Sequence, residues 1–343
     1  MGVTGAGRPE RALPFALRRL RWKQAHALHQ WEARQRPPLG AQVGGHRLEA
    51  MLGEGGQGTV YRARGPGGLC ALKLIPLRLG GPWAWRELEV LRRLRGPGIV
   101  ALRGQGLWPL EAPRFLYLVL EYVRGPTVSA WARKARPGAR RVARLVLQLA
   151  RVLEAVHRAG VVHRDVKGAN VLVRAEDGAP VLVDFGVSTY AGAREPPGPL
   201  LPPGTAHARS PEALRFLREH GPGERYVSTA REDLWALGVL LSWLLTGRWP
   251  FHAGEPEAVL SLEPVPARLL NPRVPEALGA VCLRLLAKAP EARYPTAAAV
   301  AQALEKALAG ADLHWDVPLL GGHPRDTTRE ITSMLSPRYE STH

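Results

Sequence analysis

The sequence predicts an α+β fold of two lobes, a small β-rich lobe with one main helix and a larger helical lobe. Short apolar runs separated by glycine fill residues 46–75 and return at 99–105 and 115–123, as strands do. Beyond residue 126 apolar residues recur at helical spacing, most clearly over 140–160. Because the stretch RGPT at 124–127 separates the two parts, we expect the lobes to join near residues 121–126.

The composition is that of a globular protein with an excess of positive charge. The 343 residues include 47 Lys and Arg against 30 Asp and Glu, a formal charge of +17. This charge favours anionic partners, although abundant Arg, Ala, Gly and Pro would also follow from a GC-rich gene. Two distant cysteines, Cys70 and Cys282, fit a reducing compartment. The longest apolar segment, 234–247, is too short to cross a bilayer, so we expect a cytoplasmic protein with no transmembrane segment.

Residues 1–44 form a basic N-terminal extension that can be helical. Five apolar residues of 11–31 fall on one helical face: Leu13, Leu17, Leu20, Leu28 and Trp31. This pattern is compatible with docking to a partner or to an anionic surface. A helix packed on the body, or a loose arm, is the simpler interpretation. We find no nucleic-acid-binding module and expect no specific nucleic acid.

The first strands carry the glycine pattern G-x-G-x-x-G at Gly53, Gly55 and Gly58. A dinucleotide fold would need a helix after it and an acid about 20 residues on, but no Asp or Glu occurs between Glu54 and Glu87. A P-loop would need a lysine before Thr59, which is absent. The remaining interpretation is a β-hairpin whose glycine tip covers a nucleotide triphosphate.

The next strand contains Lys73 among apolar neighbours, where a lysine needs an anionic partner. The helix PWAWRELEVLRRLR is predicted to start at Pro82. Glu87 shares a helical face with apolar residues, whereas Glu89 shares one with arginines and faces solvent. We therefore predict that Lys73 pairs with Glu87.

Two polar motifs in the second lobe are more specific than the glycines. The stretch VVHRDVKGANVLV, 161–173, places a polar loop between two short apolar runs, and VLVDFGVST, 181–189, is an apolar strand that ends in Asp184. Together with the glycines and Lys73, they resemble the eukaryotic-type protein kinase family, and its bacterial serine/threonine members in particular. The resemblance covers about 46–309 and implies the protein-kinase-like fold, with an N-lobe of about 46–122 and a C-lobe of about 126–309.

The resemblance implies a role for each matched residue. Asp165 would orient the substrate hydroxyl and accept its proton, Asn170 and Asp184 would hold Mg²⁺, with Mn²⁺ as an alternative, and Lys73 with Glu87 would position the phosphates. Scaffold roles are implied for Glu212, Asp233 and Arg293. ATP would contact the glycine hairpin, the following strands and the segment after Leu120: Leu52, Gly53, Glu54, Gly55, Gly56, Gln57, Gly58, Val60, Ala71, Lys73, Glu121 and Val123.

The substrate side resembles that of serine/threonine kinases. Lys167, two residues after Asp165, and Thr205, expected to hydrogen-bond near both, imply protein substrates with serine or threonine acceptors. Two rival readings are a kinase-shaped scaffold that does not catalyse and a kinase of small molecules. The first typically lacks the lysine or an acid that is present here, and the second generally lacks the segment around Thr205 and Glu212.

Three departures from the family pattern have consequences. Residues 191–204 contain no Ser, Thr or Tyr, so we predict activity that needs no phosphate in that stretch. Residues 213–232 are longer than usual and are expected to form an extra helical turn or loop. The tail, 310–343, is expected to be flexible, and its many hydroxyls make it a candidate for autophosphorylation.

Overall fold

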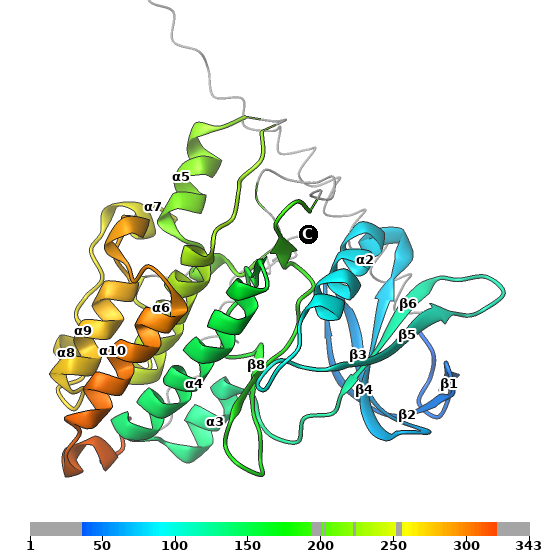
Figure 1. Ribbon diagram of the computed structural model, residues 1–343, viewed down its shortest axis with the longest axis horizontal. Helices are drawn as coiled ribbons and strands as arrows, with labels where there is room; N and C mark the ends of the chain where they lie inside the picture. Colours follow the sequence, from blue (N-terminus) through cyan, green and yellow to red (C-terminus); the bar gives the residue numbers. More distant parts are fainter. Residues whose placement is uncertain (1–35, 194–200, 202–203, 222–223, 252–255, 321–343) are drawn as a thin grey trace, which may run out of the picture.

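The computed structural model describes residues 36–193, 201, 204–221, 224–251 and 256–320. The helix predicted within 11–31 and the tail from 321 lie outside these residues. Figure 1 shows the strands of the large sheet gathered at one end of the molecule and most helices at the other. The predicted two-lobed α+β fold is confirmed.

The strands confirm the β-rich first lobe and add short pairs in the second. Their bounds are β1 Gln42–Val43, β2 His46–Gly55, β3 Gly58–Gly65, β4 Gly68–Pro76, β5 Leu102–Trp108, β6 Phe115–Glu121, β7 Val161–Val162, β8 Val171–Val173, β9 Pro180–Leu182 and β10 Thr189–Tyr190. Within the described residues, one antiparallel sheet has the order β1-β2-β3-β4-β6-β5, and the pairs β7 with β10 and β8 with β9 stand apart from it.

Helices make up most of the second lobe. Their bounds are α2 Leu77–Arg93, α3 Val128–Ala135, α4 Ala139–Arg158, α5 Pro211–Glu219, α6 Ala230–Thr246, α7 Pro256–Ser261, α8 Ala267–Leu270, α9 Glu276–Leu285 and α10 Ala297–Ala309, with 3₁₀ turns η1 Ala206–Ala208, η2 Pro290–Ala292 and η3 Leu313–Asp316. The long segment after Ser210 forms α5, which packs against α7 (Figure 1).

Helix α2 begins earlier than predicted. It starts at Leu77, directly after Pro76, so Pro82 lies inside the helix instead of opening it. Proline removes one backbone donor there, but tertiary contacts override the penalty. The Leu77 backbone N–H donates to the Arg114 carbonyl at 2.9 Å, and the Leu77 side chain packs on the core.

The alternation of β4 places Lys73 on the side of the sheet that faces α2. Leu72 and Leu74 belong to the small core of the first lobe, whereas Ile75 packs in the large core with Leu88 of α2. Successive side chains of a strand point to opposite faces, so Lys73 shares the face of Ile75. The sheet thus directs the lysine at the helix that carries Glu87.

The apolar run at 234–247 forms α6, the buried helix at the centre of the second lobe. It opens with a capping box between Thr229 and Glu232 and ends at Gly247, which has a φ of 72°. Its side chains are buried on all sides, as expected of a central core helix. In the described ranges no helix is both long and apolar enough to cross a membrane.

The packed body extends beyond the predicted domain limits of 46 and 309. Val43 of β1, an edge strand of the sheet, is fully buried in the core of the first lobe, so part of the predicted extension belongs to that lobe. At the other end, η3 packs against α4, and Trp315 and Leu319 are buried in the large core. Residues 310–320, predicted as flexible tail, are therefore part of the second lobe.

Candidate active site

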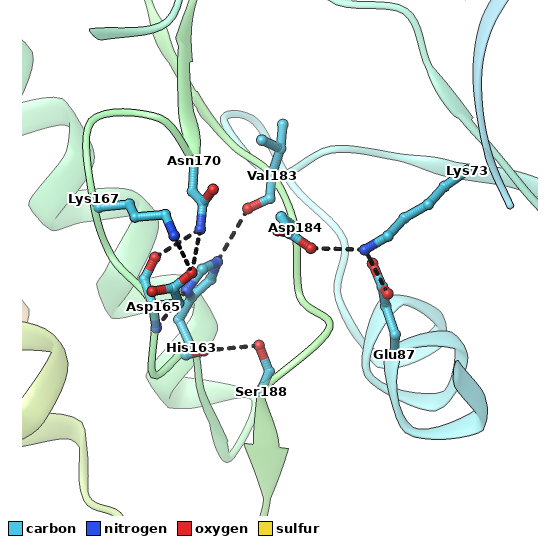
Figure 2. A network of polar contacts seen from close by, with 9 residues as sticks. All are labelled: Lys73, Glu87, His163, Asp165, Lys167, Asn170, Val183, Asp184 and Ser188. Atoms are coloured by element: carbon cyan, nitrogen blue, oxygen red, sulfur yellow. Dashed lines mark hydrogen bonds and ion pairs between the residues drawn. The ribbon is translucent and has the colours of Figure 1, made fainter. Parts of the chain in front are cut away.

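Lys73 lies between two carboxylates at the junction of the lobes (Figure 2). Its Nζ donates to both oxygens of Glu87 at 2.7 Å and to Oδ1 of Asp184 at 2.7 Å. Lys73 and Glu87 are almost fully buried, with 4% and 2% of their surface exposed. The predicted pair of Lys73 with Glu87 is confirmed, and Asp184, which follows β9, joins it from the second lobe.

The electrostatics of this triad favour the charged forms of Lys73 and Asp184 but not of Glu87. Burial alone would lower the pKa of Lys73, but Asp184 and Glu87 outweigh burial and raise it. Burial raises the pKa of Glu87 against the opposing effect of Lys73. The pKa of Asp184 is lowered, because Lys73 outweighs the effect of burial. Lysine and aspartate are thus held charged next to each other.

A second polar cluster surrounds Asp165 in the loop between β7 and β8. Thr205 Oγ1 donates to Asp165 Oδ1 at 2.6 Å, and Lys167 Nζ donates to Thr205 Oγ1 and lies 2.8 Å from Asp165 Oδ2. Asn170 Nδ2 donates to the backbone carbonyl and to Oδ2 of Asp165, both at 2.9 Å (Figure 2). The expected contacts of Thr205 with Asp165 and Lys167 are present. Burial would raise the pKa of Asp165, but the hydrogen bond and charge of Lys167 lower it.

Helix α6 anchors the loop around Asp165 through the side chain of Asp233. Asp233, completely buried, accepts the backbone N–H groups of His163 and Arg164 at 2.8 Å each. Arg164 adopts a φ of 68°, an unfavourable value for a residue with a side chain, and the two hydrogen bonds compensate for it. The His163 ring packs edge-on against Phe185, with centroids 4.8 Å apart, so the loop also contacts the segment after Asp184.

Asp184 also has a left-handed backbone. Its φ is 63°, in the left-handed region that residues with a side chain adopt only in a few per cent of cases, aspartate more often than most. The neighbouring Val183 accepts a hydrogen bond from the ring of His163 at 3.2 Å (Figure 2). This strained turn directs the Asp184 carboxylate toward Lys73.

The remaining scaffold residues match their implied roles. Arg293, almost completely buried, donates from two nitrogens to the two oxygens of Glu212 at 2.7 Å each. The same guanidinium donates to the carbonyls of Ala287 and Arg231. This ion pair ties the start of α5 to the turn before α10.

The glycine tip closes over a cavity between the lobes. The hairpin ends with Gly55 opposite Gly58, and Gly58 has a φ of 125°. The cavity measures about 650 Å³, and its lining includes the tip, Trp83 and Ala84, and several residues of the two polar clusters: Gly55, Gly56, Gln57, Gly58, Glu87, Asp165, Lys167 and Thr205. The structure thus brings the glycine tip, Glu87 and part of the Asp165 cluster around one space, whereas Lys73 and Asp184 are not in its lining.

The other residues predicted to contact ATP, Lys73 among them, lie on or next to the strands of the first lobe and are not in the lining of this cavity. Ala71 pairs with Leu120 across β4 and β6, and Val60 of β3 pairs with Lys73. Glu121 ends β6 and accepts a hydrogen bond from Arg174 at 3.1 Å, and Val123 is buried just beyond. On β2, Leu52, Gly53 and Glu54 are exposed.

Three features of the site were not predicted. Arg36, from the predicted extension, pairs with Glu54 and lines the cavity. The Oε1 atom of Gln57 occupies the space where Gly186 would carry a Cβ atom, so the tip touches the turn after Asp184. Tyr190 donates a hydrogen bond to Glu89. None of these contacts has a local sequence signal, because each joins distant parts of the chain.

A family model and several known proteins are similar to this chain. A model of the protein kinase domain matches residues 46–304. The serine/threonine-protein kinase PknE of Mycobacterium tuberculosis is 34% identical over 286 residues, which cover 80% of this chain and 48% of PknE. PknD of the same organism is 34% identical over 302 residues, covering 83% and 43%. Pkn1 of Myxococcus xanthus is 34% identical over 294 residues, covering 80% and 40%. The chain therefore spans less than half the length of these relatives.

Proposed function

Because the chain belongs to the protein kinase family, and within it is similar to bacterial serine/threonine kinases, we propose that it transfers the γ-phosphate of ATP to serine and threonine hydroxyls of proteins. The observation that carries this proposal is that both polar clusters are intact and contribute to the lining of one cavity, the first through Glu87 and the second through Asp165, Lys167 and Thr205. Lys73 is paired with Glu87 and Asp184, and Asp165 is hydrogen-bonded to Thr205 and Asn170.

We assign the phosphate-binding role to Lys73, the side chain that keeps its charge in a buried site. Glu87 holds it in place, and the glycine tip, including Gly55 and Gly56, supplies backbone N–H groups to the phosphates. The strands behind supply the adenine side, with Val60 and Ala71 against the base and the backbone of Glu121 and Val123 at its edge. Leu52 and Glu54 would flank the tip.

The donor set fits a hard divalent cation. Asp184 offers carboxylate oxygens, and Asn170 uses its Nδ2 as donor, which leaves its oxygen as a ligand. Among the described residues no group of three or more His, Cys, Asp or Glu side chains could hold a metal alone, so phosphate and water oxygens would have to complete its coordination. We infer Mg²⁺, which when bound would neutralise charge developing on the phosphates.

Asp165 performs the proton chemistry in this proposal. Its lowered pKa makes it a weak base, so it first orients the acceptor hydroxyl and takes its proton late in the transfer. The acceptor oxygen bonds to the γ-phosphorus while the bond to ADP breaks. Lys167, 2.8 Å from Asp165, supplies a compensating positive charge, and Thr205 fixes both side chains.

The finer biological statements belong to the same proposal. We infer a role in bacterial signalling, from the similarity to PknE and PknD, and autophosphorylation of the hydroxyl-rich tail beyond residue 320. The kinase domain would act in the cytoplasm, where ATP is available. The basic segment before Arg36 would contact a docking partner or an anionic surface.

Phosphate transfer from labelled ATP tests the proposal. The purified protein is incubated with Mg²⁺ and a generic basic protein, beside Lys73→Ala, Asp184→Asn and the exposed control Lys134→Ala. We expect both site variants to lose at least about 100-fold in rate, because each removes a charge from the transition state. Lys134→Ala should match the wild type. Equal rates in all four proteins, or no transfer by wild type with Mg²⁺ or Mn²⁺, would contradict the proposal.

A further inference from the structure

Helix α2 is joined to β10 by side chains on a face next to Glu87. Tyr190 donates its hydroxyl proton to Glu89. The Arg93 guanidinium lies over the Tyr190 ring, 4.0 Å from its centroid, and Arg86 lies 5.5 Å from it. Arg86, 5% exposed, also donates to Thr189 Oγ1 at 3.2 Å. Positions 86, 89 and 93 follow helical spacing, so one stripe of α2 makes all these contacts.

Strand β10 is itself fixed to the loop that carries Asp165. Thr189 pairs with Val162, and Tyr190 pairs with Val161, in the β7–β10 ladder. Just before β10, Ser188 donates its hydroxyl to the backbone carbonyl of His163 at 3.1 Å (Figure 2). The contacts of α2 with β10 therefore connect the helix that bears Glu87 to the loop that bears Asp165.

The Tyr190 hydroxyl is a suitable donor for a hydrogen bond to Glu89 that needs no modification of either residue. Acceptance by Glu89 raises the pKa of Tyr190, so the hydroxyl remains a neutral donor at physiological pH. A hydrogen bond to a charged acceptor is stronger than one between neutral groups. Two arginines beside the ring add cation–π attraction and balance the charge of Glu89.

The sequence explains why such a link would be needed. Residues 191–204 contain no Ser, Thr or Tyr, so no hydroxyl in that stretch can receive a phosphate that would bind cationic side chains. Fixing α2 without a phosphate in that stretch requires groups that are present without modification. Tyr190 and Glu89 are such groups.

We propose that Tyr190 and Glu89, supported by Arg86 and Arg93, are positioning residues that hold α2 where Glu87 pairs with Lys73, without any phosphate in the segment 191–204. They act through Glu87 and Lys73 and touch neither nucleotide nor substrate. This inference rests on the proposed function, because it assigns a consequence for phosphate transfer. The inference predicts that Lys73 and Glu87 are already paired in the kinase that carries no phosphate in 191–204.

Three variants and a matched control test the inference in the full chain. Tyr190→Phe removes the hydroxyl and keeps the ring, Glu89→Gln removes the charge, and the double variant removes both. Tyr294→Phe is the control, because Tyr294 also lies beneath an arginine, with the Arg284 guanidinium 4.3 Å from its centroid, but in the second-lobe core. All four are compared with wild type for kcat and for the KM of ATP.

We expect Tyr190→Phe and Glu89→Gln each to lower kcat roughly fivefold to tenfold, the loss of one hydrogen bond to a charged group at a partly exposed site. The double variant should fall no further than the single ones, because both changes remove the same bond. Tyr294→Phe should stay within about twofold of wild-type kcat, whatever it does to the melting temperature. Wild-type kcat in both single variants, or effects that multiply, would overturn the inference.

Two further measurements separate this inference from the proposed function. Hydrogen exchange of the α2 backbone amides should accelerate in Tyr190→Phe and Glu89→Gln relative to Tyr294→Phe, even in a protein that transfers no phosphate. Unchanged exchange would overturn the positioning role independently of activity. Phosphatase-treated wild type, shown by mass spectrometry to carry no phosphate, should keep its kcat. A loss to the level of Tyr190→Phe would show that a phosphate, not this contact, positions α2.

Discussion

Thr205 links Asp165 and Lys167 through its hydroxyl group. Its hydroxyl donates to Asp165 at 2.6 Å and accepts from Lys167 at 2.8 Å, so one oxygen fixes the proposed base and its cationic neighbour. No apolar side chain of the same shape can do either. The Thr205 hydroxyl therefore fixes the relative orientation of Asp165 and Lys167.

Replacing Thr205 by valine keeps the shape and removes the hydroxyl. We expect kcat to fall about 10- to 100-fold, the effect of losing hydrogen bonds to charged groups. The KM of ATP should change little, because Thr205 contacts the acceptor side. Steady-state kinetics with varied ATP and varied protein substrate provide the measurement. Thr205→Ser should recover most of the rate, and a valine variant with wild-type kcat would show that the hydroxyl is dispensable.

Single residues of the site differ in how far the sequence could predict them. Helical phase predicts that Glu87 faces inward, because its neighbours on one face are apolar, and the structure confirms its pairing with Lys73. The bond between Lys73 and Asp184 spans 111 positions and leaves no periodic signal. Glu89 is exposed as predicted, yet it accepts a hydrogen bond from Tyr190, because exposure does not exclude a partner from another element.

At the scale of the elements, the surroundings of two glycines of the hairpin, Gly55 and Gly58, differ. Gly58 has a φ of 125°, and a Cβ atom there would overlap the backbone carbonyl of Leu74. Gly55 has open space where its Cβ would stand. The structure therefore requires glycine at Gly58, whereas any requirement at Gly55 has to come from the nucleotide.

The same substitution at both positions separates folding from ATP use. We expect Gly58→Val to lower the free energy of unfolding by about 2 kcal/mol, because a β-branched residue cannot adopt the positive φ without strain. Gly55→Val should melt like wild type but show a reduced kcat/KM for ATP. Thermal melts and ATP titrations are the two measurements. If Gly55→Val binds and uses ATP normally, the tip does not lie over the phosphates.

The start of helix α2 is set by tertiary packing and not by the local sequence. Pro82 in a favourable first-turn position led to a predicted start there, but the helix begins at Leu77. The earlier turn contains Gly80 and Gly81, poor helix formers, so its helical state depends on packing against the core. Such tertiary stabilisation cannot be read from propensity.

For the whole molecule, the motifs located the lobes but not the limits of the packed body. The family pattern ends near residue 309, and residues 310–320, although they include apolar residues such as Trp315 and Leu319, show no regular helix or strand spacing. In the structure, Arg140 of α4 pairs with Asp316 at 2.9 Å and donates to the carbonyl of Asp312. Leu319 also donates its backbone N–H to Pro137. These contacts are long-range, and the local sequence pattern, which does not contain them, therefore predicts a tail.

Trp315 tests whether 311–320 stabilises the second lobe. It is 5% exposed and packs in the large core beside α4, the helix that leads to the loop of Asp165. We expect Trp315→Ala to lower the free energy of unfolding by about 3 kcal/mol, as large-to-small changes in cores do. Urea denaturation measures this effect.

The neighbouring Leu313, 85% exposed, is the control, and Leu313→Ala should unfold like wild type. Well below the melting transition, both variants should transfer phosphate at the wild-type rate, because neither residue touches the two polar clusters. If Trp315→Ala unfolds at the same urea concentration as Leu313→Ala, the segment adds nothing to the fold. If it keeps its stability but loses phosphate transfer, the segment acts on the site through α4 instead of through the core.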